Sequence, residues 1–309
     1  MEKENLSKEE MEKNPAGTAY DDAFRTLIED REKLILPVLN ELFGEKYDDS
    51  AQITPLPNEQ LFRDTLEKLK KVITDANFKV TFDGKEKSYH IECQSTEDKT
   101  MLVRVFEYSA LIGIAESDGV KKETLTINLP HSAIIYLRHS KKMPDKMEIN
   151  ICTPGGKVSY DVPVLKVKTY SVEEIFEKKL LFLIPFHIFK YENDFSKFEN
   201  DERELAKLLE TYEKITDKLN KMVLNREVST FTVKTIEIAT KTVLEQIAKN
   251  YKKVMEGVEN FMVGRALQYE AKDIFNEGIE QGREEGREEV RLELNQVIFH
   301  KDKEIARLK

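Results

Sequence analysis

The sequence predicts an α/β fold followed by a helical region, and three patterns support this prediction. A helical segment over 21–43 precedes a two-stranded hairpin over 75–94, and a second helix is expected over 101–115. Further strands are expected next, and from residue 171 the chain changes to long segments with helical spacing. The order helix, hairpin, helix and strands is typical of an α/β sandwich.

The first helix is predicted from apolar residues at helical intervals, namely Ala23, Leu27, Leu34, Val38 and Leu42. Gly44 follows as a stop signal. Residues 1–16 are charged and lack periodicity, so we expect a frayed leader there. After a loop around Pro55 and Pro57, the charged segment Glu59–Lys70 predicts another helix.

The hairpin is predicted from apolar and polar residues that alternate from Asp75 onward. Its first strand has an apolar face, Ala76, Phe78, Val80 and Phe82, and a polar face, Asp75, Asn77, Lys79 and Thr81. The return strand has an apolar face, Tyr89, Ile91 and Cys93, and a polar face, His90, Glu92 and Gln94. Asp83-Gly84 predicts a tight turn, because both central positions of the favoured turn need positive φ.

The position of that turn decides which residues face each other. With Asp83-Gly84 in a two-residue turn, Asp75 lies directly across from Glu92. With the turn at Gly84-Lys85, Asp75 lies across from Gln94 instead. Either register keeps these polar side chains on one face, because side chains alternate with period two.

Two interpretations of this acidic face stay open on the hairpin alone. Like charges opposite each other destabilise a sheet, and Mg²⁺ or Mn²⁺ bound between Asp75 and Glu92 would offset the repulsion and organise a water nucleophile. The alternative is the solvated face of an amphipathic hairpin, which the hairpin by itself favours.

The remaining elements follow from the same patterns. Strands are expected at 124–129, 132–138, 146–152 and 158–168, and helices at 172–182, 200–223, 230–256 and 266–309. The last helix contains Gly278, Gly282 and Gly286, and each interior glycine costs roughly 1 kcal/mol relative to alanine. We therefore expect this tail to need a partner for stability.

Composition excludes several classes of protein. The 309 residues are 40% hydrophobic and 35% charged, which predicts a soluble protein with a buried core. No apolar run reaches the roughly 20 residues needed to span a membrane, and the N-terminus has no apolar signal core. Two cysteines, five histidines and no Cys-x-x-Cys argue for a cytoplasmic protein without a structural zinc site.

The net charge of −9 counts against nucleic-acid binding, because phosphate contacts usually need a basic surface. Much of the acid lies in the N-terminal tail and in the run from Glu284 to Glu289. This distribution leaves room for a locally basic cleft elsewhere.

Asp75, followed by a hairpin and then Tyr89-His90-Ile91-Glu92-Cys93-Gln94-Ser95, resembles the active-site signature of the PD-(D/E)XK nuclease superfamily. More narrowly, the chain resembles the PD-(D/E)XK family transposases, which are related to recombination-promoting nucleases. Further matching stretches are 20–27, Arg104–Tyr108, 129–133, 153–156, 183–186 and 269–272, so the resemblance covers about residues 18 to 290.

The resemblance implies a restriction-endonuclease-like mixed sheet flanked by helices. It implies that Asp75 and Glu92 are the metal ligands and that Gln94 stands where the superfamily usually has lysine. A lysine would supply positive charge to the scissile phosphate, whereas glutamine only orients a water or donates a hydrogen bond. The proline that usually precedes the first aspartate is also replaced, by Thr74.

Other polar residues have two interpretations each. Asp21 matches an acidic residue of related nucleases that binds metal, but it is equally an acid favoured by the start of a helix. Arg104 and Tyr108 share a helical face and would contact DNA, brace Glu92 or simply pack. For His90 we favour a hydrogen-bonding sheet histidine over a metal ligand.

We therefore predict a leader at 1–16, a nuclease-like core at 17–170, a helical region at 171–272 and a charged helical tail at 273–309. The expected function is Mg²⁺-dependent DNA cleavage linked to transposition or recombination. A homodimer through the C-terminal helices, as a short coiled coil, is a further hypothesis, because cutting both strands needs two sites. The alternatives are a catalytically silent DNA- or protein-binding relative and a helical scaffold.

Overall fold

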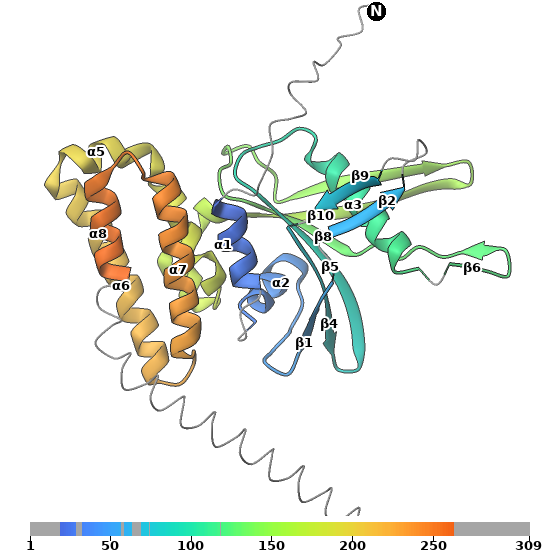
Figure 1. Ribbon diagram of the computed structural model, residues 1–309, viewed down its shortest axis with the longest axis horizontal. Helices are drawn as coiled ribbons and strands as arrows, with labels where there is room; N and C mark the ends of the chain where they lie inside the picture. Colours follow the sequence, from blue (N-terminus) through green and yellow to red (C-terminus); the bar gives the residue numbers. More distant parts are fainter. Residues whose placement is uncertain are drawn as a thin grey trace, which may run out of the picture. The chain divides into compact units, whose positions relative to one another are not determined.

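The computed structural model describes residues 19–28, 33–56, 59–63, 69–73, 75–117 and 119–262. They form an α/β structure in which a mixed six-stranded sheet with helices is followed by a C-terminal helical region (Figure 1). The predicted leader and the predicted tail helix 266–309, with its dimer hypothesis, lie outside these residues.

The sheet has the order β1-β4-β5-β8-β10-β9. Its strands are β1 (Gln52–Pro55), β4 (Ala76–Phe82), β5 (Lys85–Gln94), β8 (His131–Tyr136), β9 (Lys146–Thr153) and β10 (Gly156–Lys166). The pairs β5–β8 and β8–β10 are parallel, and the other neighbours are antiparallel. Two small ribbons accompany the sheet, β2 (Glu59–Arg63) with β3 (Leu69–Ile73) and β6 (Val120–Lys121) with β7 (Thr124–Leu125).

Helices lie on both sides of the sheet and make up the C-terminal region. The helices before residue 170 are α1 (Ala19–Ile28), α2 (Ile35–Phe43), α3 (Met101–Ala115) and the short 3₁₀ helix η1 (Val167–Thr169). The later ones are α4 (Val172–Glu177), η2 (Leu181–Lys190), η3 (Glu192–Asp194), α5 (Phe195–Asn200), α6 (Glu202–Leu224), α7 (Thr230–Ile247) and α8 (Lys252–Met262). Among the helices described, none is both long and apolar enough to cross a membrane.

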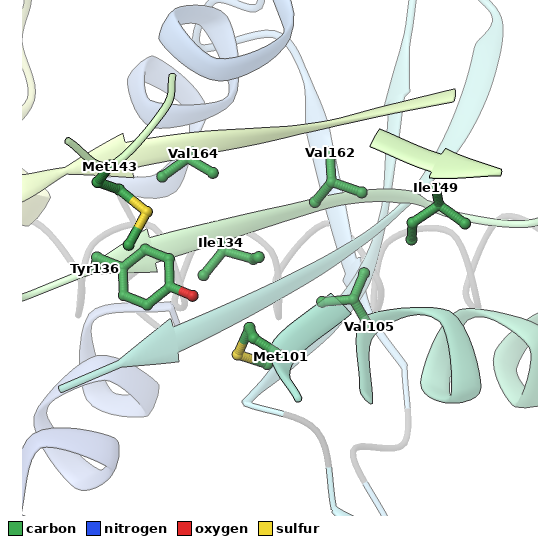
Figure 2. Close-up of a cluster of buried hydrophobic side chains, with 8 residues drawn as sticks. All are labelled: Met101, Val105, Ile134, Tyr136, Met143, Ile149, Val162 and Val164. Atoms are coloured by element: carbon green, nitrogen blue, oxygen red, sulfur yellow. The ribbon is translucent and has the colours of Figure 1, made fainter. Parts of the chain in front are cut away.

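The core of the sheet domain is built on both faces of the sheet. On one face, α3 packs against β8, β9 and β10 through an apolar cluster (Figure 2) made of Met101, Val105, Ile134, Tyr136, Met143, Ile149, Val162 and Val164. On the other face, Phe43 at the end of α2 contacts the rings of Tyr89 and His131, with centroids 5.3 Å and 5.9 Å away. Strands β5 and β8 are therefore covered on both sides.

The β4–β5 hairpin has the predicted turn and the first of the two predicted registers. Asp83 and Gly84 have φ of 50° and 71°, the left-handed conformation that the turn requires. Phe82 pairs with Lys85, and the ladder continues in register to Ala76 opposite Ile91.

The predicted helix over 21–43 is wrong as a single element, because α1 and α2 are separate helices. Lys33 has a φ of 57°, which no right-handed helix can contain, so the chain must turn there. Pro37 lies in the first turn of α2, where its missing N–H is tolerated.

The predicted helix Glu59–Lys70 is also wrong, since β2 and β3 pair from Glu59 with Ile73 to Arg63 with Leu69. Ladder hydrogen bonds outweigh the weak helix preference of a charged segment. The predicted strand 124–129 shrinks to β7. After β7 the chain passes close to α3, where a Cβ on Gly113 would lie 2.8 Å from the Asn128 carbonyl oxygen.

Two predicted helices of the C-terminal region end early. The segment 172–182 leaves the α-helix after Glu177, and the apolar run that follows becomes the buried 3₁₀ helix η2. The segment 230–256 breaks after Ile247. The break lets α8 turn back so that Val254 and Val258 become buried.

Helix α1 is packed on the C-terminal helical region. It contacts α7, and two aromatic pairs join it to η2. Tyr20 meets Phe189 with ring centroids 5.1 Å apart, and Phe24 meets Phe182 at 5.2 Å. The helical region thus holds the element that carries Asp21.

A candidate metal centre at the β4–β5 hairpin

The two predicted carboxylates lie at the open end of the β4–β5 hairpin. Glu92 belongs to β5, and Asp75 directly precedes β4. One step beyond the last ladder pair, Ala76 with Ile91, places Asp75 opposite Glu92. The backbone N–H of Cys93 donates a hydrogen bond to Asp75 Oδ2 at 2.8 Å, which fixes the aspartate against β5.

Glu92 is buried, with 1% of its surface exposed, and both of its oxygens have partners. His90 Nε2 lies 2.9 Å from Oε1, and Arg104 on α3 donates to Oε2 at 3.0 Å. This hydrogen bond supports the hypothesis that Arg104 braces Glu92. Because α3 covers this face, the alternative of a solvated face is wrong: His90 is 0% exposed and Asn77 is 4% exposed.

Behind Glu92 runs a chain of buried polar groups. His90 Nδ1 is 3.4 Å from the Ser109 hydroxyl, and that hydroxyl is 2.7 Å from the Ser132 hydroxyl. Ser109 also donates to the Val105 carbonyl oxygen at 2.6 Å. His90 is thus a hydrogen-bonded sheet histidine, as expected.

The electrostatics of the pair are unfavourable without a cation. Burial, and then the charge of Glu92, raise the pKa of Asp75 to about 7. The N–H of Cys93 and, more weakly, the charge of Arg104 lower the pKa of Asp75 but do not compensate. At neutral pH, ionisation of Asp75 beside Glu92 therefore lowers the free energy of unfolding.

Asp21 belongs to the same electrostatic group. It lies in the first turn of α1, and its charge further raises the pKa of Asp75 and that of the buried Cys93 thiol. Asp21 is therefore both a first-turn acid of a helix and a third carboxylate near the pair. The two interpretations of this residue are compatible.

The other predicted residues line the same region. Arg104 lies over the ring of Tyr108, 5.8 Å from its centroid, and that ring is 6.0 Å from the ring of His90. Gln94 ends β5, two residues beyond Glu92 on the same face, and pairs with Tyr136 of β8. Its side chain is partly exposed at the carboxyl edge of the sheet.

No family model, curated protein or solved structure matches the chain. The similarity to PD-(D/E)XK nucleases therefore stays a prediction. A function has to be argued from the site itself.

The donor set suits a hard divalent cation. Mg²⁺ prefers carboxylate oxygens and is commonly held by one or two carboxylates, with water and substrate phosphates as its other ligands. Asp75 and Glu92 offer such a pair, and their mutual repulsion is what a cation would relieve. Each carboxylate oxygen has two lone pairs, so the contacts of Glu92 with His90 and Arg104 leave it able to coordinate.

The pair is not a complete protein cage. Within the described ranges, no three His, Cys, Asp or Glu side chains are already arranged to hold a metal ion. This arrangement fits an ion that keeps several waters and does not fit a zinc site, which takes four or three protein ligands.

Two members of the site, Ser109 and Ser132, were not identified from the sequence. Ser109 interrupts an apolar stretch of α3, and Ser132 looked like the start of a core strand, which it also is. The missing information was the parallel pairing of β5 with β8, which sets Ser132 beside His90.

Proposed function

We propose that this protein is a Mg²⁺-dependent DNA endonuclease that hydrolyses phosphodiester bonds, and that it acts in transposition or recombination. The observation that carries the proposal is the pairing of the half-buried Asp75 with the buried Glu92, where burial and the charge of Glu92 raise the pKa of Asp75 to about 7. Burial of Asp75 beside a second carboxylate lowers the stability of the folded protein, and sites with strongly perturbed carboxyl groups are often functional. Mn²⁺ would be an alternative ion.

In this proposal each residue has a separate role. Asp75 and Glu92 hold the ion, which when bound supplies a Lewis acid and an activated water. Asp21 adds negative charge from α1. Gln94 orients water at the exposed edge, and Arg104 and Tyr108 would lie close enough to the site to contact a DNA phosphate.

The two cysteines of the chain are free, Cys93 in the core and Cys152 at the surface. Free thiols persist in a reducing compartment, so we propose a cytoplasmic location. The proposed partner is DNA, and no membrane partner is needed.

A second candidate function is supported by the contacts of Glu92. Arg104 already neutralises Glu92, and His90 occupies its other oxygen. A relative that kept the fold but lost turnover would have such an internal counter-charge in place of the metal. It would bind DNA or protein without cleaving.

A plasmid-nicking assay separates these candidates. Wild-type protein is expected to relax supercoiled plasmid with Mg²⁺, and Asp75→Asn is expected to abolish this. Asp83→Asn is the matched control, because it makes the same chemical change at the exposed turn of the same hairpin, where Asn tolerates positive φ. Full activity in Asp75→Asn would refute the assignment, and DNA binding without cleavage by the wild type would favour the second candidate.

A further inference from the structure

The hydrogen bond between His90 and Glu92 has a direction. An ionised carboxylate only accepts hydrogen bonds, so His90 Nε2 must carry the proton that lies between it and Glu92 Oε1 at 2.9 Å. The opposite nitrogen, Nδ1, then faces Ser109. Ser109 donates its hydroxyl proton to the carbonyl oxygen of Val105, one turn earlier in α3, and lies 2.7 Å from the Ser132 hydroxyl on β8.

We propose that His90 is a positioning residue for the metal centre: it fixes the Glu92 carboxylate so that a divalent cation can bind between Glu92 and Asp75. This inference rests on the proposed function. It assigns to His90 a role through Glu92, without contact to the ion or to the DNA.

The first argument is the balance of forces on Glu92. Arg104 holds Oε2 from α3, and on its own a guanidinium would draw the carboxylate into a closed ion pair. His90 holds Oε1 from the same strand as Glu92, so the carboxylate is tied at both oxygens. With both oxygens tied, Glu92 keeps one orientation.

The second argument is that the imidazole is a costly choice for packing alone. Its ring is 0% exposed, and a buried polar group is stable only when its hydrogen bonds are made. An apolar side chain would fill the same space beside Tyr108 without needing Ser109 and Ser132. The polar chain is therefore best explained by what it does to Glu92.

The experiment measures Mn²⁺ binding by calorimetry on the full chain, with wild type, His90→Leu and His90→Gln. His90→Leu removes the donor, and we expect roughly 10- to 100-fold weaker Mn²⁺ binding, the usual effect of losing an outer-shell partner. His90→Gln keeps an N–H donor at the position of Nε2 and should restore most of the affinity. A side chain that only packs would not show this difference.

The control is His131→Gln, which makes the same change at an exposed position one strand away, on the opposite face from Glu92. It should leave Mn²⁺ binding unchanged. Urea unfolding without metal is measured for each variant, and if His90→Leu does not fold, Ser109→Ala replaces it with an expected loss of a few fold.

The outcomes separate the two proposals. A wild-type chain that binds no Mn²⁺ overturns the proposed function and this inference with it. Tight wild-type binding that His90→Leu does not weaken overturns the inference alone. Equal weakening in His90→Leu and His90→Gln also overturns it, because the donor at Nε2 would then not matter.

Discussion

Replacing Asp75 by asparagine is expected to stabilise the folded protein at pH 8. The pKa of Asp75 is raised from 3.8 to about 7 in the fold, chiefly by burial and by Glu92. The folded chain therefore holds this proton more tightly than the unfolded chain. The resulting penalty is small near pH 4, grows as the pH rises and is complete above pH 7.

The size of the effect follows from the difference between these two pKa values. At roughly 1.4 kcal/mol for each tenfold change in proton affinity, the upper limit is about 4 kcal/mol at pH 8. The asparagine that replaces Asp75 can still accept the Cys93 N–H, but more weakly than a carboxylate does. The expected gain is therefore about 2 to 4 kcal/mol.

The assay is urea unfolding of wild type, Asp75→Asn and Asp83→Asn at pH 5 and pH 8 without divalent ions. The gain of Asp75→Asn should be larger at pH 8, and Asp83→Asn should show no such dependence. Saturating Mn²⁺ should narrow the gap by stabilising the wild type. A wild-type chain as stable as Asp75→Asn at pH 8 would show that neither burial nor the charge of Glu92 disfavours the ionised form of Asp75 in the fold.

Two further predictions concern a buried histidine and a closely packed glycine. Burial lowers the pKa of His187 to about 4 in the folded protein. The free energy of unfolding is therefore unaffected by this histidine above pH 6.5, and it decreases as the pH falls from 6.5 toward 4. In urea unfolding, His187→Phe should remove up to about 3 kcal/mol of this acid-induced decrease in the free energy of unfolding. A variant whose free energy of unfolding depends on pH as the wild type's does would contradict this prediction. Gly113→Ala should destabilise by about 1–3 kcal/mol despite the better helix propensity of alanine, because the new Cβ would meet the Asn128 carbonyl at 2.8 Å. Gly155→Ala, with its nearest atom at 3.8 Å, is the control in thermal unfolding, and equal stabilities would refute the clash.

The local parts of the site could be predicted from the sequence. Asp83-Gly84 has one favoured conformation, and counting outward from it sets Asp75 against Glu92. Arg104 was a candidate brace for Glu92 because it shares a face with Tyr108 on the helix that follows the hairpin. These inferences depend on neighbours in sequence, where the geometry of turns and helices is strict.

The non-local parts could not be predicted. The polar face of the hairpin alternates as a solvated strand does, and only the packing of α3 over it buries His90 and Glu92. Ser132 joins the site through the parallel register with β5, which the long crossover through α3 does not reveal. The β2–β3 ribbon was missed because a charged segment satisfies helix and strand patterns alike.

The packing of α1 against the C-terminal helical region limits where this chain can be truncated. Tyr20 and Phe24 are buried against Phe189 and Phe182, so a fragment that stops at residue 170 would leave those rings in water. Each exposed aromatic ring carries roughly 150–250 Å² of surface. The expected product of such a truncation is an aggregating fragment whose first helix no longer brings Asp21 toward the hairpin. The helical region after residue 170 is thus needed for the stable packing of α1.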